Sequence, residues 1–191
     1  PVIAIIGDGA LFNSGLPALL EVVHRQAAVT IIVLDNGCNA LTGCQKNPGS
    51  DRELLRDGDV SIPIEPLLKA AGLRFFRRVS PYDPKKLTRV LTDALNRRQP
   101  TVILAKAPCV RLLEPGAARP MQVKSSKCVG LETCSRPCLS VLACPSLEAD
   151  STGKAAITSL TCVGCGLCKI VCPHQAIKKS WKIPGFSGGQ P

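Results

Sequence analysis

Eight of the chain's 11 cysteines lie close together in sequence, between Cys128 and Cys172. The last four follow the pattern C-x2-C-x2-C-x3-C-P, which runs from Cys162 to Pro173. This spacing is typical of a [4Fe–4S] cluster, because a tight loop of small residues can bring successive thiolates to different irons. A structural zinc site is the alternative, but zinc usually takes two separated C-x2-C pairs. The pattern therefore favours iron–sulfur chemistry.

Four further cysteines precede this run and form a second candidate site, with gaps of five, three and five residues. In two-cluster ferredoxins the fourth cysteine of a run ligates the other cluster. We therefore assign Cys128, Cys134, Cys138 and Cys172 to one [4Fe–4S] cluster. The second [4Fe–4S] cluster takes Cys144, Cys162, Cys165 and Cys168. The irregular spacing of the first set leaves an empty site or a three-iron cluster as alternatives.

A different chemistry is indicated near the N-terminus, where polar residues follow two apolar runs. The sequence Gly-Asp-Gly around Asp8 ends the first run, and Asn36 follows the second. Asp8 offers a carboxylate oxygen, Asn36 an amide oxygen and Cys38 a backbone carbonyl. Mg²⁺ prefers such oxygen ligands and completes its shell with diphosphate and water. Gly9 lets the backbone approach a phosphate closely, so the pattern predicts a magnesium–diphosphate site.

These residues need a scaffold of alternating strands and helices. We expect strands at 2–6, 29–34, 73–79 and 101–105, and helices at about 13–26, 63–71 and 83–97, with a polar loop over 35–59. Asn13 or Ser14 can cap the first helix, and Pro17 suits its first turn. The continuous apolar runs at 2–6 and 29–34 are typical of strands buried on both faces. The alternation predicts a parallel α/β sheet covered on both sides, with Asp8 and Asn36 at its carboxyl edge, where ligands bind.

Charge and composition divide the chain into two units. Residues 1–73 have a net charge of −3 and residues 74–191 one of +13, which together give +10. Residues 107–124 are rich in proline and predict a linker. We therefore predict an α/β domain over 1–106, truncated at its N-terminus, and then the linker. A small α+β domain like a two-cluster bacterial ferredoxin follows at 125–179, and a tail at 180–191.

The composition also argues against several classes of protein. Hydrophobic residues make up 45% of the chain, too many for a disordered segment. We expect no membrane span, because no apolar run reaches 18 residues. Residues 1–6 lack the basic region and cleavage site of a signal peptide, and the chain opens inside an apolar run, which indicates a fragment. Nucleic acid is not expected as a partner, since aromatic residues are only 3% of the chain.

Two stretches, GDGALFNSGLPALLEVV and VTIIVLDNGCNALTGCQKNPGS, resemble the thiamine-diphosphate domain of the 2-oxoacid:ferredoxin oxidoreductases. Within that family, the chain is most similar to the α subunit of indolepyruvate ferredoxin oxidoreductases, which also ends in a two-cluster ferredoxin domain. The resemblance covers nearly the whole chain to about residue 179. The chain departs from the family pattern at Asn13, Leu41 and Cys44, and its first cluster motif is longer by four residues.

The resemblance implies a cofactor, an activity and partners. It implies that Asp8, Asn36 and the Cys38 carbonyl bind Mg²⁺, that the diphosphate lies near Gly9, and that residues 39–45 form a wall of the cofactor site. It implies oxidative decarboxylation of an aryl 2-oxoacid such as indolepyruvate, with coenzyme A as acyl acceptor and ferredoxin as electron acceptor. A smaller β subunit is the implied partner, and the activating glutamate lies outside this chain, so we expect the fragment to be inactive alone.

Other interpretations stay open at this point. The substrate could be pyruvate or another 2-oxoacid, or the chain could be a non-catalytic electron carrier or a zinc-bound nucleic-acid module. The basic residues between Arg77 and Arg98 form either a solvated helix face or a docking surface for ferredoxin or coenzyme A. Cys38, Cys44 and Cys109 are expected to be ordinary thiols. Oxygen-sensitive clusters predict an anaerobic cytoplasm.

Overall fold

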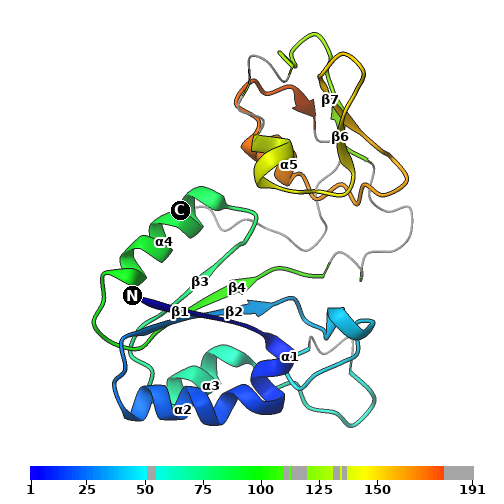
Figure 1. The fold of residues 1–191 in the computed structure, drawn as a ribbon. Coiled ribbons are helices and arrows are strands. Elements are labelled where there is room, and N and C mark those ends of the chain that lie inside the picture. Colours follow the sequence, from blue (N-terminus) through cyan, green and yellow to red (C-terminus); the bar gives the residue numbers. More distant parts are fainter. Residues whose placement is uncertain (51–54, 110–111, 113–119, 131–133, 135–136, 179–191) are drawn as a thin grey trace. The chain divides into compact units, whose positions relative to one another are not determined.

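The computed structural model describes residues 1–50, 55–109, 112, 120–130, 134 and 137–178. In this part of the chain there are two compact units, one ending at Leu112 and the other beginning at Pro120 (Figure 1). Each unit has its own core, so each is described separately. The predicted tail at 180–191 lies outside the described residues. None of the described helices has the length and hydropathy that crossing a bilayer requires.

A four-stranded parallel sheet forms the centre of the first unit, as the alternation of strands and helices predicts. Its strands are β1 (Val2–Gly7), β2 (Val29–Asp35), β3 (Phe76–Val79) and β4 (Thr101–Lys106). They lie in the order β1-β2-β4-β3. The register places Ile5 beside Ile32 and Ile32 beside Ile103. Because all the strands run in one direction, the loops that follow β1, β2 and β4 meet at the same edge of the sheet.

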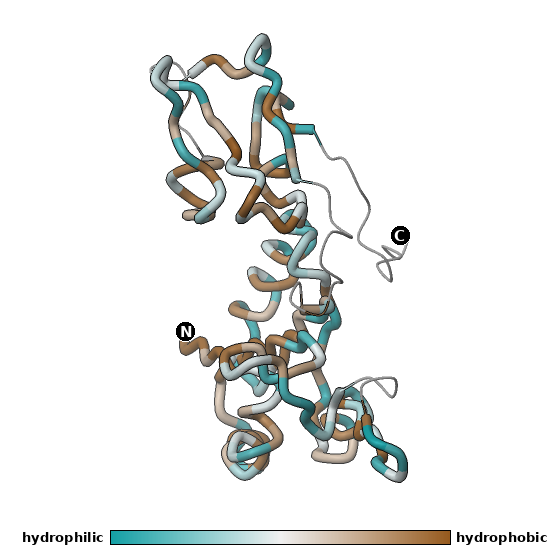
Figure 2. Tube along the Cα trace, turned by 90° about the vertical axis from the view of Figure 1, so that its right-hand side faces the viewer, coloured by the Kyte–Doolittle hydropathy of each residue, from teal (hydrophilic) through white to brown (hydrophobic). Residues whose placement is uncertain are grey.

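Helices cover the two faces of this sheet unequally. They are α1 (Asp8–Ala10), α2 (Leu16–His24), α3 (Ile64–Ala70) and α4 (Pro84–Leu95). Figure 1 shows α2 and α3 on one face and α4 on the other. Leu19 and Leu68 pack with Val33 on the first face, whereas Ala94 packs with Ile103 on the second. Figure 2 shows hydrophilic and hydrophobic residues mixed along the trace. In α4, Leu87, Val90 and Leu91 recur at helical spacing and pack towards Ile103, which gives this helix one apolar side.

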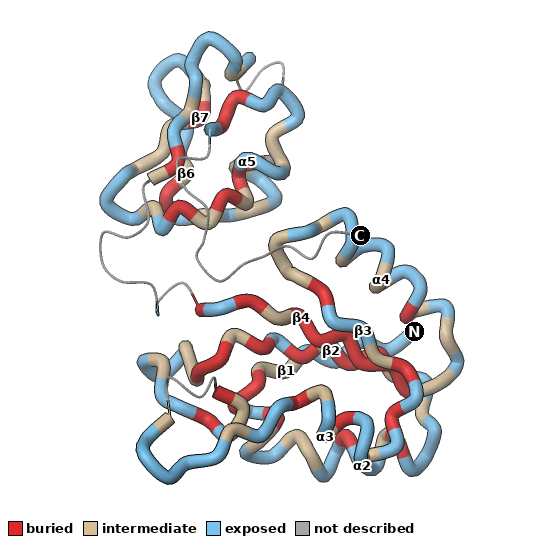
Figure 3. Tube along the Cα trace, turned by 180° about the vertical axis from the view of Figure 1, so that it is seen from behind, coloured by how far each residue is buried: buried red, intermediate tan, exposed pale blue. Residues whose placement is uncertain are grey.

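The prediction that β1 is buried on both faces is wrong. Ile5 is 66% exposed and Leu34, on the neighbouring strand, is 45% exposed. The reason is that β1 is an edge strand and that α4 packs against β3 and β4 rather than against β1. The expectation of a sheet covered on both sides therefore holds at the β4 side only. Figure 3 shows the buried stretches of β2 and β4 between the more exposed outer elements.

The first helical segment begins at Asp8, directly after β1, and not near residue 13 as expected. Asn13 and Ser14 cap no helix, because both lie inside a π-helical turn, Leu11–Gly15, that joins α1 to α2. Pro17 lies in the first turn of α2, as predicted. Proline lacks an N–H and its ring clashes with the carbonyl four residues earlier, here that of Asn13. The wider π-helical turn relieves this clash.

The remaining helices of the first unit lie where the sequence predicts them. Helices α3 and α4 fall within the ranges expected for them, and Asp83 caps α4 by accepting a hydrogen bond from the Lys86 N–H at 3.0 Å. Strand β3 is shorter than predicted. Gly72 ends α3 with a positive φ of 82°, and Leu73 and Phe75 are buried before β3 begins. The Phe75 carbonyl accepts a hydrogen bond from the Val102 N–H of β4 at 3.1 Å.

The second unit consists of short elements around a core that combines aliphatic and sulfur-containing side chains. Its strands are β5 (Gln122–Val123), β6 (Leu147–Ala149), β7 (Ala155–Ile157) and β8 (Ile177–Lys178), with one helix, α5 (Leu167–Val171), and a π-helical turn (Pro137–Val141). Strand β5 pairs with β8, and β6 with β7, both antiparallel. Cys138 and Cys168 lie in the core beside Met121 and Ile177.

The predicted linker at 107–124 contains residues of both units. Val123 pairs with Ile177 in the second unit, and Met121 is buried there. At the other end, the Cys109 N–H donates a hydrogen bond to the Asn36 carbonyl in the first unit. The proline content of this range identified a break in the chain, but the apolar residues at its two ends pack into the two cores.

Candidate cofactor sites

Asp8 joins the turns that follow β1 and β2. Its carboxylate is only 3% exposed. One oxygen, Oδ1, accepts a hydrogen bond from the Gly9 N–H at 2.8 Å, and Oδ2 accepts one from the Gly37 N–H at 3.0 Å. The second bond connects residues far apart in sequence, so the two turns are held together as the parallel sheet predicts. Each carboxylate oxygen keeps a lone pair that can bind a cation.

Asn36 and Cys38 contribute two further oxygens to this edge of the sheet. Asn36 Oδ1 accepts a hydrogen bond from the Cys38 N–H at 3.1 Å, and the Cys38 carbonyl accepts one from the Ala40 N–H at 2.9 Å. Gly37, with φ of 80°, allows the sharp turn between them. Both oxygens keep a free lone pair. A carboxylate, an amide oxygen and a carbonyl form the donor set that Mg²⁺ prefers, so these residues fit the predicted ion.

Gly9 leaves room for the side chain of a second loop. A Cβ atom at this position would collide with the side-chain oxygen of Asn39. Asn39 begins a short loop that ends at Gln45, where the Asn39 N–H donates a hydrogen bond to the Gln45 carbonyl at 2.8 Å. This loop therefore lies against the Gly-Asp-Gly turn, in the position that a wall of the diphosphate site would need.

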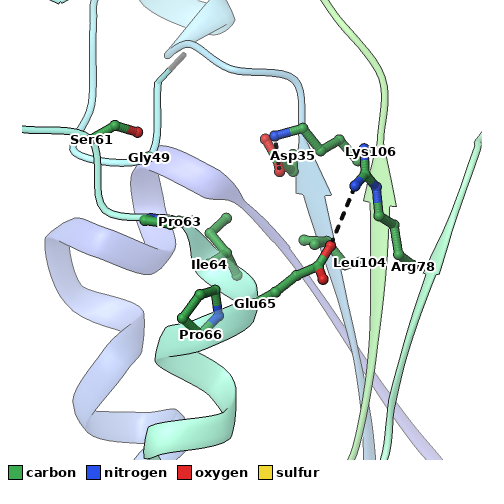
Figure 4. A pocket seen from close by; sticks show the side chains of 10 residues that line it. All are labelled: Asp35, Gly49, Ser61, Pro63, Ile64, Glu65, Pro66, Arg78, Leu104 and Lys106. Carbon is green, nitrogen blue, oxygen red and sulfur yellow. Dashed lines mark ion pairs between the residues drawn. The ribbon is translucent and has the colours of Figure 1, made fainter. Parts of the chain in front are cut away.

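A polar cavity of about 270 Å³ lies at the same edge of the sheet, between β2, β4 and the start of α3 (Figure 4). Two ion pairs line it. Lys106 Nζ lies 3.1 Å from Asp35 Oδ2, and Arg78 Nη1 lies 3.6 Å from Glu65 Oε1. Asp35 is buried and immediately precedes the predicted magnesium ligand Asn36. The cavity thus offers both charge signs next to the candidate ion site.

In the second unit, one set of thiols gathers around Cys138. Burial raises the pKa of the Cys138 thiol, and the nearby thiols of Cys172, Cys134 and Cys128 raise it further. Negative charges on several thiols within reach of one another disfavour ionisation unless a cation is bound. This set includes Cys172 from the C-terminal run, as expected if the last cysteine of each run binds the cluster of the other run.

A second set gathers around Cys168. Burial raises the pKa of the Cys168 thiol to about 11, and Cys165, Cys162 and Cys144 contribute to the increase. Cys144 here comes from the earlier run. The Sγ atom of Cys162 also accepts a hydrogen bond from the Met121 N–H, at 3.4 Å. Such N–H···S bonds are among the features that set the potential of iron–sulfur clusters.

Three cysteines outside these runs also converge, which the sequence analysis missed. The Sγ atoms of Cys38, Cys44 and Cys109 all lie within 4.8 Å of one another. Burial raises the pKa of the Cys38 thiol well above its usual range, and its neighbours Cys44 and Cys109 add to the effect. A signal was present in the sequence, since two of these residues follow one predicted strand and the third follows another. What was lacking was the order of the strands, which makes β2 and β4 neighbours.

Comparison with known families accounts for both units. Residues 1–105 match the family described as thiamine pyrophosphate enzyme, C-terminal TPP binding domain. The chain belongs to this family. Residues 131–182 match the LdpA Fe-S cluster-binding domain. These matches confirm the predicted order of a parallel α/β cofactor domain followed by a small cysteine-rich iron–sulfur domain.

Curated relatives extend over almost the whole chain. The indolepyruvate oxidoreductase subunit IorA of Pyrococcus abyssi is 36% identical over 185 residues, which is 93% of this chain and 28% of the relative. The same subunit of Methanothermobacter thermautotrophicus is 34% identical over 183 residues, or 95% of this chain and 28% of the relative. The homology confirms the resemblance stated from the sequence. The chain thus spans less than a third of the length of these relatives.

A solved structure shares the fold. It is a 2-oxoglutarate:ferredoxin oxidoreductase from Magnetococcus marinus, determined with 2-oxoglutarate, coenzyme A and succinyl-CoA bound. The match has a TM-score of 0.50 and 20% sequence identity, and covers 58% of this chain and 41% of that chain. At this identity the likeness shows the fold alone.

Proposed function

We propose that this chain is the cofactor-binding and electron-exit part of an oxidoreductase that acts on aryl 2-oxoacids, with indolepyruvate as the substrate. In the proposed reaction the 2-oxoacid loses CO₂, its acyl group is transferred to coenzyme A, and two electrons pass to ferredoxin. The observation that carries the proposal is the combination, in one chain, of turns joined at Asp8 with two sets of four cysteines. The names of the relatives support indolepyruvate, and pyruvate is the alternative substrate.

In the first unit, Asp8, Asn36 and the Cys38 carbonyl would hold the Mg²⁺ ion of thiamine diphosphate. The cofactor, when bound, supplies the carbanion chemistry that allows CO₂ to leave. The protein's part is to position it. The Asp8 side chain is buried, and two backbone N–H groups fix its carboxylate. Binding of a cation therefore costs little further side-chain entropy, because the carboxylate is already ordered.

In the second unit, we propose two [4Fe–4S] clusters. Cys128, Cys134, Cys138 and Cys172 would bind one, and Cys144, Cys162, Cys165 and Cys168 the other. The grouping of the thiols around Cys138 and Cys168 supports this division. The electrons would leave the first unit one at a time through these clusters.

A group of lysines around a hollow in the second unit supports the proposal that the electron acceptor is acidic, as ferredoxin is. Lys124, Lys127, Lys169 and Lys178 line a cavity of about 330 Å³. A hydrogen bond and the like charge of Lys178 lower the pKa of Lys124, which shows how closely the positive charges are crowded. An acidic partner would relieve this crowding, and Lys169 directly follows the cluster ligand Cys168. A smaller β subunit and a cytoplasmic location complete the proposal.

Titration calorimetry with thiamine diphosphate and Mg²⁺ tests the role of the first unit. We expect the chain to bind the cofactor and Asp8→Ala to abolish the heat, because the buried carboxylate is the only charged group in the predicted ligand set. Asp57→Ala removes an exposed carboxylate of the same unit and is the matched control. Equal heats for Asp8→Ala and the unaltered chain, or no heat for either, would favour a non-catalytic electron carrier instead.

A second assay tests the substrate. The full-length subunit together with its β subunit should reduce ferredoxin when given indolepyruvate and coenzyme A. A higher kcat/KM for pyruvate would move the proposal to the alternative substrate, and no activity with any 2-oxoacid would contradict the enzyme assignment.

A further inference from the structure

We propose that Cys38, Cys44 and Cys109 form a binding site for one thiophilic metal ion, zinc, in the first unit. Their three Sγ atoms lie within 4.8 Å of one another, and the Sγ atoms of Cys44 and Cys109 are 3.6 Å apart. Two thiolates bound to one zinc ion are about 3.8 Å apart, given Zn–S bonds of about 2.3 Å and a tetrahedral angle. The thiols of Cys44 and Cys109 therefore already have the spacing that a single ion requires, and the Cys38 thiol lies within 4.8 Å of both.

The backbone brings these thiols together from two loops. Cys38 and Cys44 belong to the loop after β2, and Cys109 follows β4. The Cys109 N–H donates a hydrogen bond to the Asn36 carbonyl at 3.0 Å, which fixes the second segment against the first loop. The Cys44 N–H donates one to the Asn39 carbonyl at 2.9 Å. The convergence is thus part of the packing at the carboxyl edge of the sheet.

Cys44 is held in an uncommon backbone conformation. Its φ is 62°, in the left-handed region that non-glycine residues rarely adopt. The preceding residue, Gly43, also has a positive φ, of 117°, so the chain turns sharply just before the thiol. Cys44 is half-buried, whereas Cys38 and Cys109 are buried. The sharp turn places the Cys44 thiol beside Cys109, and its partial exposure gives an ion a route to the buried pair.

The chemistry of the donor set selects the ion. Three thiolates prefer zinc or another soft cation over Mg²⁺, which takes oxygen ligands. On binding, each thiol loses its proton to solvent as a Zn–S bond forms, so one Zn²⁺ displaces three protons and no electron is transferred. Three protein ligands leave the fourth position of a tetrahedral ion open to water.

The same donors do not suit the two alternatives. A [4Fe–4S] cluster takes four thiolates spread over four irons, and this group offers three thiols close together. A disulfide between Cys44 and Cys109 would use only two of the three thiols and would leave the buried Cys38 thiol unbonded beside it. Zinc uses all three. The ion would link the loop over Asn39–Gln45 to the segment after β4, and this inference does not depend on the proposed enzymatic activity.

Zinc analysis of the whole chain tests the proposal. The chain is reconstituted anaerobically with iron and sulfide, given Zn²⁺, and freed of loosely bound metal on a chelating resin. Zinc K-edge X-ray absorption is then measured, because this signal is independent of the iron. We expect about one zinc per chain with three sulfur neighbours at about 2.3 Å.

Two variants and a control make the test specific. Cys109→Ser and Cys44→Ala should each lose the zinc while the iron content stays unchanged. Thr42→Ala alters an exposed side chain of the same loop and should keep the zinc. If substitution of the buried Cys109 unfolds the unit, the half-buried Cys44 position decides, after circular dichroism has shown that Cys44→Ala is folded.

Three results would overturn the proposal. They are the absence of zinc from fully iron-loaded protein, zinc with only nitrogen and oxygen neighbours, and equal zinc in the folded Cys44→Ala variant and the unaltered chain. A Cys44–Cys109 disulfide found by mass spectrometry in anaerobically prepared protein would also overturn it. Thiamine-diphosphate binding is measured separately, so failure of this site and failure of the proposed function can be told apart.

Discussion

The two units of this chain form their cores from different side chains. In the first unit, branched and aliphatic residues such as Val33, Leu68 and Leu104 fill the space between a sheet and its helices. In the second, Cys138 and Cys168 lie in the core, and three further cysteines and several aliphatic residues pack around it. The first core consists of carbon side chains alone, whereas the second mixes aliphatic residues with five cysteines that are candidate metal ligands.

This difference indicates that the units depend on their cofactors to different degrees. Strands of two or three residues, as in the second unit, are too short for independent stability. Where ligands come together only in the folded state, the free energy of metal binding is also free energy of folding. We therefore expect the iron–sulfur clusters to hold the second unit together and thiamine diphosphate to add little to the fold of the first.

Removal of the clusters should produce the largest effect. Anaerobic chelation of the iron should expose the amides of residues 121–178 to hydrogen exchange, because the thiol core then loses its metal bonds. The amides of β2 and β4 should keep their protection. Exchange followed by mass spectrometry measures both regions in one sample. Equal loss of protection in the two units, or none in the second, would contradict the claim that only the second unit depends on its clusters for folding.

Truncation of the aliphatic core should have the next largest effect. Leu68 is fully buried, and Leu68→Ala should lower the free energy of unfolding of the first unit by about 2–5 kcal/mol through lost contacts and a cavity. Iron content should not change. Urea unfolding followed by circular dichroism gives the first quantity and metal analysis the second. Leu41→Ala, at a position 98% exposed, is the control and should be nearly neutral; loss of iron in Leu68→Ala would show that the units are not independent.

Loss of a helix cap should have a smaller effect in the first unit. Asp83→Ala removes the carboxylate that accepts a hydrogen bond at the start of α4, which should cost about 1 kcal/mol. Asp93→Ala breaks only an exposed ion pair with Arg97 on the same helix and should cost about 0.3–0.5 kcal/mol. Equal costs in urea unfolding would mean that the cap contributes no more than a surface charge.

Charge reversal should have the smallest effect, and this effect should differ between the two units. Lys127→Glu lies at the lysine hollow of the second unit and should slow electron transfer to an acidic ferredoxin by about two- to threefold at low salt, or less than about 0.7 kcal/mol. Lys85→Glu, on the exposed face of α4, is the matched control and should leave the rate unchanged. Stopped-flow reduction at low and high salt measures both. A slower rate for Lys85→Glu alone would place the docking surface on the first unit.

The candidate cofactor site could be predicted because it depends on strand direction alone. Two apolar runs followed by Asp8 and Asn36 suffice, since parallel strands place both residues at one edge whatever lies between them. The run from Cys162 to Cys172 was equally clear from its spacing, whereas the irregular spacing of the first set left its cluster open.

Other features required information that the sequence does not carry locally. The convergence of Cys109 with Cys38 depends on β4 lying next to β2, and strand order is a property of the whole sheet. The exposure of Ile5 depends on where α4 packs, not on the apolar run itself. The first helical segment starts at Asp8, earlier than expected, and a π-helical turn joins it to α2, where Pro17 lies in the first turn.

Iron and acid-labile sulfide in the anaerobically reconstituted chain test the central claim most directly. Two [4Fe–4S] clusters, bound by the sets around Cys138 and Cys168, predict about eight irons and eight sulfides per chain. About four of each would contradict a full cluster at Cys128, Cys134, Cys138 and Cys172. Zinc in place of iron in the second unit would contradict the role of this chain in electron transfer.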